Sequence, residues 1–126
     1  MEIGVLIVDD EEDIRFLIRA IIDAADEGLR VLGEARDGKE ALEHIDELDP
    51  KVVVLDERMP GKTGIETAVD IGQKRPGQRI ILCSAYLDDE LVARAEEAGI
   101  KVCLSKQEVR LIPQTLRDLT PECAAN

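Results

Sequence analysis

The chain alternates short apolar runs with longer amphipathic stretches, five times over. Three of the runs, Val5–Val8, Val52–Leu55 and Ile80–Cys83, are continuously apolar. Runs of this kind are typical of strands that helices cover on both faces of a parallel sheet. The pattern therefore predicts an α/β fold with right-handed crossovers. The five predicted strands are Ile3–Val8, Leu29–Ala35, Val52–Leu55, Arg79–Cys83 and Lys101–Leu104.

The stretches between these runs carry helical periodicity and helix-start signals. In residues 14–22, isoleucines and a leucine recur at the spacing of a helix turn, so they fall on a single helix face. Asp37, Thr63 and Ser105 stand where N-caps are expected, each with a glutamate three residues later. Pro113 lies inside the pattern of the last helix, so we expect that helix to be kinked or split.

A single domain accounts for the length of the chain. Its 126 residues suffice for one hydrophobic core and are too few for two. The alternating pattern occupies residues 1–119, and we expect Thr120–Asn126 to be a loose tail. Cys123 in that tail should be an exposed thiol, whereas Cys83 and Cys103 lie inside apolar runs and should be buried.

The charge of the chain excludes several classes of function. Acidic residues outnumber basic ones by 28 to 16, and the formal net charge is -12. Such a surface repels phosphate backbones and anionic lipids, so we expect no direct binding of nucleic acid or membrane. No apolar run is long enough to cross a bilayer, and the N-terminus lacks the features of a signal peptide. These observations predict a cytoplasmic domain whose acidic excess favours a cation or a basic partner.

Three aspartates stand where predicted strands end. Asp9 and Asp10 directly follow the first strand, and Asp56 directly follows the third. If those strands are neighbours, the three carboxylates meet at one edge of the sheet. Two unit charges ~4 Å apart repel by roughly 4 kcal/mol at an effective dielectric near 20, so the cluster needs a counter-charge. A hard divalent cation with oxygen ligands, most simply Mg²⁺, would supply it.

Two further side chains fall at the same edge. Ser84 ends the fourth strand and offers a hydroxyl, and Lys106 follows the fifth and offers a flexible ammonium. Aspartate can attack phosphorus to form an acyl phosphate, and phosphoryl transfer asks the protein chiefly for positioning and for neutralised charge. Helix caps and solvated loops would explain one aspartate but explain three at strand ends poorly. The set predicts phosphoryl transfer to a carboxylate.

Four segments, taken together and in order, resemble the response-regulator receiver family of two-component signalling. They are Val5–Asp10, Leu55–Gly61, Ser84-Ala85 and Lys106. The similarity covers nearly the whole chain, roughly Glu2 to Leu119. It implies a flavodoxin-like (βα)5 fold with a five-stranded parallel sheet of order 2-1-3-4-5 and helices on both faces. The switch point of such a sheet lies between its first and third strands, which is where the aspartates stand.

The resemblance also implies a role for each residue. Asp56 would be the phosphoacceptor, and Ser84 and Lys106 would bind the phosphoryl oxygens. The implied ligands of Mg²⁺ are Asp9, Asp10, Asp56 and the backbone carbonyl of Arg58. Members of the family take phosphate from a sensor histidine kinase or a phosphotransfer protein and hydrolyse it slowly. The implied function is therefore a phosphorelay switch in signal transduction rather than an enzyme, with the fourth and fifth helices presenting the change to a partner.

One position departs from the family pattern. The family usually carries Tyr or Phe three residues before the lysine, and this chain has Cys103 there. The only aromatic residues are Phe16 and Tyr86. Either the switch is muted, or Tyr86 supplies the moving ring. Arg58 and Tyr86 would also stand at the mouth of the site and tune the lifetime of the phosphate.

Three alternatives stay open at this point. The chain ends just after the fifth helix, and Met59–Gly61 and Leu104–Lys106 are reminiscent of regulators with helix-turn-helix output domains, so it could be the receiver part of a longer DNA-binding regulator. A nucleotide- or flavin-binding module would want a glycine-rich loop where Asp9–Glu12 stands. A phosphatase with Asp56 as nucleophile would want a second acid at the position of Arg58.

Overall fold

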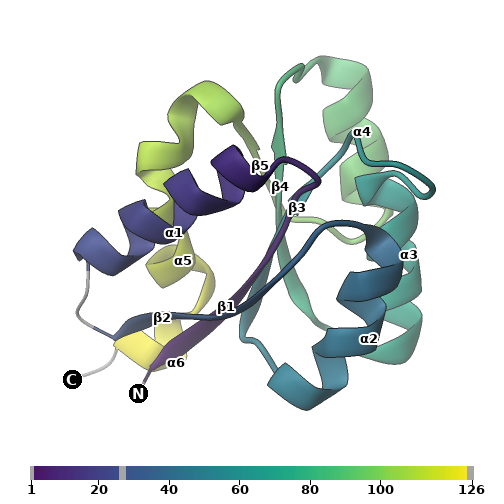
Figure 1. The fold of residues 1–126 in the computed structure, drawn as a ribbon. Coiled ribbons are helices and arrows are strands. Elements are labelled where there is room, and N and C mark those ends of the chain that lie inside the picture. Colours follow the sequence, from purple (N-terminus) through teal and green to yellow (C-terminus); the bar gives the residue numbers. More distant parts are fainter. Residues whose placement is uncertain (1, 26–27, 125–126) are drawn as a thin grey trace.

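A five-stranded parallel sheet forms the centre of the molecule (Figure 1). The computed structural model describes residues 2–25 and 28–124. The strand order is β2-β1-β3-β4-β5, and every neighbouring pair is parallel. The predicted flavodoxin-like topology is therefore confirmed. The strands are β1 (Ile3–Val8), β2 (Leu29–Ala35), β3 (Val52–Asp56), β4 (Arg79–Ser84) and β5 (Val102–Ser105).

Helices cover both faces of this sheet, as predicted. In Figure 1, α1 and α5 lie on one side, and α2, α3 and α4 lie on the other. A 3₁₀ helix, η1, leads from β5 into α5, and a short helix, α6, follows α5. The helices are α1 (Glu12–Ala25), α2 (Gly38–Leu48), α3 (Gly64–Lys74), α4 (Asp89–Glu97), η1 (Lys106–Leu111), α5 (Ile112–Leu119) and α6 (Pro121–Ala124).

The continuous apolar runs follow from this double cover. In β3, Val52 and Val54 join the apolar cluster under α1 and α5. Val53 and Leu55 join the cluster under α2, α3 and α4. Because successive side chains of a strand point to opposite faces, a strand covered on both sides must be apolar at every position. All five residues of β3 are buried, including Asp56 at its end.

The helix-start signals at Asp37 and Thr63 are confirmed, whereas the Ser105 hydroxyl accepts from the Gln107 amide, not from that of Glu108, and begins a 3₁₀ helix. The Asp37 carboxylate accepts a hydrogen bond from the amide of Glu40, and Thr63 forms a reciprocal capping box with Glu66. The predicted split also occurs, because η1 ends at Leu111 and α5 begins at Ile112. Pro113 then lies in the first turn of α5, where its missing N–H removes no helical hydrogen bond.

The prediction of a loose tail with an exposed thiol at Cys123 is wrong for the described residues. Thr120 is fully buried, and its hydroxyl donates to the carbonyl of Leu116 at 2.7 Å. Cys123 is buried in the cluster under α1 and α5. Arg79 also pairs with Glu122 at 2.6 Å. Apolar surface left at the start of the strands explains why this segment packs; residues 125 and 126 lie outside the described part.

Of the predictions that the other two cysteines are buried, one is confirmed and one is wrong. Cys83 on β4 is buried, as expected. Cys103 on β5 is only half-buried, because β5 is an edge strand with no further strand beside it. Within residues 2–25 and 28–124, no helix combines the length and the apolar character that crossing a membrane requires.

Candidate functional site

The three predicted aspartates meet at the carboxyl edge of the sheet. Strands β1 and β3 are hydrogen-bonded neighbours, with Val8 beside Leu55, so the residues that follow are adjacent. One carboxylate oxygen from each of Asp9, Asp10 and Asp56 lies within 4.8 Å of the other two. Asp9 and Asp56 are buried, and Asp10 is exposed. The chain thus concentrates up to three negative charges in one crevice.

Lys106 provides the positive charge nearest to these aspartates. Its Nζ atom lies 3.0 Å from Oδ2 of Asp9 and 3.0 Å from Oδ1 of Asp56. A third carboxylate, that of Glu11, is 3.7 Å away. The residue follows β5, which is two strands from β3, so its long side chain passes over the end of β4 to reach the pair. One ammonium is therefore shared by two buried carboxylates.

The pKa of Asp56 reflects its burial and the carboxylate beside it. Burial raises the pKa of Asp56 to about 6, and the Asp9 carboxylate adds to the rise, while Lys106 opposes it. Burial alone would lower the pKa of Lys106, but hydrogen bonds and charges from Asp9 and Asp56 hold it above its ordinary value. The lysine is therefore charged, and the pocket still carries excess negative charge. This donor set fits a hard divalent cation such as Mg²⁺, because all three candidate side-chain ligands offer carboxylate oxygens.

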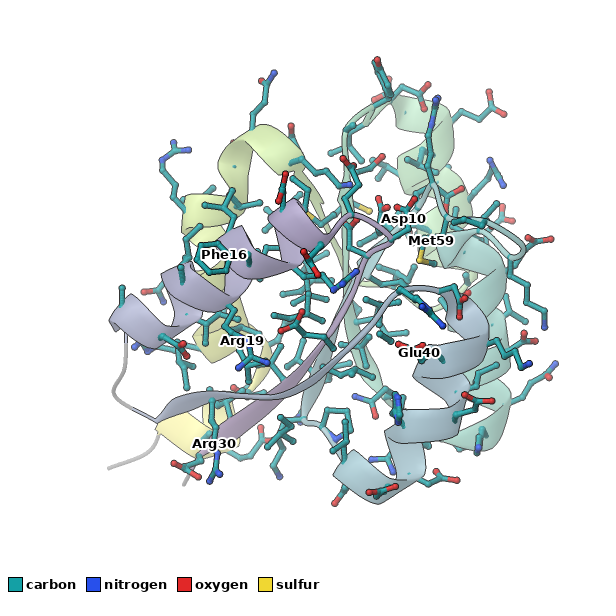
Figure 2. All side chains as sticks on the ribbon, viewed as in Figure 1. Asp10, Phe16, Arg19, Arg30, Glu40 and Met59 are labelled. Carbon is teal, nitrogen blue, oxygen red and sulfur yellow. The ribbon has the colours of Figure 1, made fainter. Side chains whose placement is uncertain are left out.

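Asp10 faces a hollow beside this pocket. Figure 2 shows Asp10 near Met59, which follows β3, and both line the same cavity of about 670 Å³. Arg58 and Ser84 line it too. The hollow therefore exposes Asp10, and not the buried Asp9 and Asp56, to solvent on this side. The role of the Arg58 carbonyl as a metal ligand stays a prediction.

The loop after β3 is folded tightly against Asp56. The Gly64 amide donates to the Glu57 carbonyl at 2.9 Å, and a Cβ atom on Gly64 would lie 2.2 Å from the backbone oxygen of Asp56. The buried Glu57 carboxylate accepts a hydrogen bond from the amide of Ile65 at 2.9 Å. Glu57 thus ties the loop to the start of α3. Our sequence predictions missed this residue, because nothing in its neighbourhood distinguishes it from a surface glutamate.

Ser84 lies at the end of β4 and is buried. Its hydroxyl donates to the Tyr86 carbonyl at 3.0 Å and accepts from the Tyr86 amide at 3.2 Å. The Tyr86 ring is exposed, and the guanidinium carbon of Arg58 lies 4.7 Å from its centroid. Ser84 is therefore near the pocket but engaged with the next loop.

Comparison with known proteins identifies the family. The sequence model of the response regulator receiver domain matches residues 5–117. The chain is a response-regulator receiver domain. The chemotaxis protein CheY of Thermotoga maritima is 41% identical over 97 residues, which are 77% of this chain and 79% of CheY. The transcriptional regulatory protein PdtaR of Mycobacterium tuberculosis is 36% identical over 117 residues, and the chain spans 53% of its length.

Solved receiver structures have the same fold. The response regulator domain of Thermotoga maritima CheB superposes with a TM-score of 0.84 at 28% identity, over 100% of this chain and 99% of that one. The predicted membership of the two-component signalling family is therefore confirmed. The family and the acidic segment Asp9–Glu12 leave a nucleotide- or flavin-binding module without support.

The departure of this receiver domain from the family pattern is visible in its structure. Cys103 stands half-buried on β5, facing the cluster under α4. The aromatic ring nearest to Ser84 in sequence belongs instead to Tyr86, whose backbone is hydrogen-bonded to the Ser84 hydroxyl. Ser84 at the end of β4, Tyr86 in the loop that follows it and Arg58 in the loop after β3 are therefore connected.

Proposed function

We propose that this receiver domain is a phosphoacceptor switch that takes a phosphoryl group onto Asp56. One observation carries the proposal: the Lys106 ammonium lies between the carboxylates of Asp9 and Asp56, with the Asp10 carboxylate within 4.8 Å of both. A nucleophile, a cation and further ligands for Mg²⁺ are the parts that phosphoryl transfer to a carboxylate needs.

The side chains divide the chemistry between them. The Asp56 carboxylate attacks phosphorus; a new O–P bond forms, the P–N bond of the donor phosphohistidine breaks, and the imidazole leaves with the electron pair. With a pKa of about 6, Asp56 is largely ionised at neutral pH and can act as the nucleophile. Bound Mg²⁺, held by Asp9, Asp10, Asp56 and the Arg58 carbonyl, would neutralise charge on the phosphoryl oxygens. Lys106 would turn from the carboxylates to those oxygens.

The switch follows from the hydrogen bonds of Ser84. Its single O–H donates to the Tyr86 carbonyl, so the hydroxyl must release that carbonyl to donate to a phosphoryl oxygen. The loop between β4 and α4 is then freed, and the Tyr86 ring can leave Arg58. We propose that Tyr86 supplies the moving aromatic ring that Cys103 does not provide. A phosphoryl group adds about 1.5 to 2 negative charges at neutral pH, enough to recruit both Ser84 and Lys106.

The partners follow from the family. The phosphoryl donor would be a sensor histidine kinase or a phosphotransfer protein, and the output surface would be formed by α4 and α5. The site would act in the cytoplasm as a signalling switch that hydrolyses its phosphate slowly. Continuous turnover of a phosphate ester would instead revive the phosphatase alternative.

Mass spectrometry of the intact protein tests the proposal. The wild type is incubated with acetyl phosphate and Mg²⁺, beside Asp56→Asn. We expect one phosphoryl adduct on the wild type and none on the variant, because an amide cannot form the acyl phosphate. An adduct of equal yield on Asp56→Asn would place the acceptor elsewhere.

A second role is favoured by the comparisons. PdtaR is named a transcriptional regulatory protein, and the chain matches about half of it. The chain would then be the receiver part of a longer DNA-binding regulator. We expect no direct DNA binding by residues 1–126, because their net charge is -12. A gel shift with the phosphorylated and unphosphorylated chain tests this expectation.

A further inference from the structure

We propose that Arg15 is a positioning residue for the acidic pocket, because it fixes the peptide that joins Asp9 to Asp10. The inference rests on the proposed function, in which these two aspartates hold Mg²⁺. Arg15 touches neither the metal nor the phosphoryl group. It acts through the backbone of Asp9.

The contacts of Arg15 join α1 to the end of β1 and to β2. Its Nη1 donates to the backbone carbonyl of Asp9 at 2.7 Å, and its Nε donates to Oε1 of Glu34 at 3.0 Å. The side chain is only 15% exposed. Arg19, one helical turn further along α1, donates from Nε to the other oxygen of Glu34 at 2.7 Å. Figure 2 shows Arg19 between α1 and β2.

Strand β2 is the anchor of this network. Glu34 and Ala35 pair with Ile7 and Val8, the last two residues of β1. The Asp9 amide donates to the Ala35 carbonyl at 3.0 Å. Both backbone groups of Asp9 are thus tied to β2, the amide directly and the carbonyl through Arg15 and Glu34. Burial alone would raise the pKa of Glu34, but hydrogen bonds from Arg19 and Arg15 lower it, so the anchor stays ionised.

An arginine suits this position for a geometric reason. Its planar fork donates in two directions at once, whereas a lysine is a point charge on a flexible stem. With its carbonyl fixed, Asp9 keeps Oδ1 on the Glu11 amide at 2.9 Å and Oδ2 on Lys106. The nitrogen of the next residue, Asp10, belongs to the same peptide group. Loss of the Arg15 contact would let that peptide rotate and would move the Asp10 carboxylate away from those of Asp9 and Asp56.

The affinity for Mg²⁺ distinguishes a positioning role of Arg15 from a purely electrostatic effect of its charge. Arg15→Gln and Arg19→Gln each remove one positive charge and one contact to Glu34, but only the first removes the contact to Asp9. Charge alone would make both variants bind a cation somewhat more tightly. The positioning role predicts that Arg15→Gln binds Mg²⁺ about tenfold more weakly or worse, which is typical for outer-sphere partners of metal ligands. Arg19→Gln should bind as tightly as the wild type or tighter.

Isothermal titration calorimetry with Mg²⁺ measures these affinities. Arg15→Lys serves as a second variant that keeps the charge, in case Arg15→Gln does not fold; it too should weaken binding. Equal affinities for the Arg15 and Arg19 variants would contradict the proposal.

A readout without metal keeps this test independent of the proposed function. Amide hydrogen exchange of Glu11, whose N–H donates to Asp9, should be faster in the Arg15 variants and unchanged in Arg19→Gln. If the wild type binds no Mg²⁺, the metal in the proposed function fails, and the exchange rates still decide the positioning role. Unchanged exchange in the folded Arg15 variants would overturn it.

Discussion

The Nζ atom of Lys106 lies 3.0 Å from Oδ1 of Asp56, although their strands are separated by β4. The lysine shares its charge with Asp9, so the pair is not an isolated ion pair. Lys106 and Asp56 belong to a pocket that carries more negative than positive charge. The stability of the metal-free protein, its response to pH and its affinity for cations should all follow from that imbalance.

Replacing Lys106 should destabilise the metal-free protein. Lys106→Met leaves two buried carboxylates without their cation, and breaking such a buried pair costs about 3 kcal/mol or more. Urea unfolding at neutral pH measures the free energy. The double variant Lys106→Met/Asp56→Asn should regain more stability than Asp56→Asn adds to the wild type, because one of the unpaired charges is gone. Additive effects of the two substitutions would argue against the shared contact.

The pH dependence of stability should carry the signature of Asp56. Burial raises its pKa from the ordinary 3.8 to about 6, so the folded state binds this proton more tightly than the unfolded state does. Between about pH 4 and 6 the free energy of unfolding of the wild type should therefore fall, relative to Asp56→Asn, as the pH rises.

Thermal melts in the presence of a chelator test this sign. Asp56→Asn should exceed the wild type in melting temperature at neutral pH, and the gap should close toward about pH 4. Each pair of melts uses the same buffer, so that the other carboxyl groups contribute equally. A gap that widens on acidification would mean that Asp56 is stabilised as a carboxylate in the folded protein.

Magnesium should stabilise the wild type through the three aspartates. A ligand that binds only the folded state at a concentration of 100 times its Kd adds about 2.7 kcal/mol. The rise in melting temperature should be larger at neutral pH than near about pH 5, because protons on Asp56 compete with the cation. Asp10→Asn should lose most of the rise. Asp13→Asn, an exposed acid in the first turn of α1 outside the cluster, is the control and should keep it.

Gly64 should tolerate no side chain. A Cβ atom there would meet the Asp56 carbonyl oxygen at 2.2 Å, and backbone cannot yield cheaply. Gly64→Ala should therefore lower both stability and phosphorylation of Asp56. Gly72 in the last turn of α3 has nothing within 4 Å of the added atom, so Gly72→Ala should stabilise by up to about 1 kcal/mol. Chemical unfolding of the two variants compares them, and a neutral Gly64→Ala would show that the loop is looser than described.

Tyr86 should couple phosphorylation to α4. Tyr86→Ala should accept phosphate from acetyl phosphate normally, but the change in amide hydrogen exchange that phosphorylation causes in α4 should be lost. Phe16→Ala, which removes the other exposed aromatic ring, should keep that change. An identical exchange response in wild type and Tyr86→Ala would discard the ring as the moving part.

The sequence was most informative where the place of a residue at the end of a strand determines where its side chain lies in the fold. Asp9 and Asp56 directly follow or end strands that are neighbours in a parallel sheet, so their side chains must meet at its carboxyl edge. The same reasoning placed Lys106 at that edge. Each of these predictions depends on the order and direction of strands and needs no knowledge of side-chain packing.

Contacts that depend on how helices sit on the sheet were not predictable in this way. The reach of Arg15 to the Asp9 carbonyl depends on the position of α1 relative to β2. The hydroxyl of Ser84 bonds to Tyr86 in a loop whose path no periodicity describes. Cys123 was wrongly predicted to be exposed, because a short polar tail gives no sign of packing in the sequence. In the structure it packs against the apolar cluster beneath α1 and α5.

Chemical trapping of the acyl phosphate identifies the side chain that accepts the phosphoryl group. The chain is phosphorylated with acetyl phosphate and Mg²⁺, reduced with borohydride, which converts an acyl phosphate to an alcohol, and mapped by peptide sequencing in a mass spectrometer. The account predicts homoserine at position 56 and unmodified aspartate at positions 9 and 10. Reduction at either of those two positions, with Asp56 intact, would contradict it.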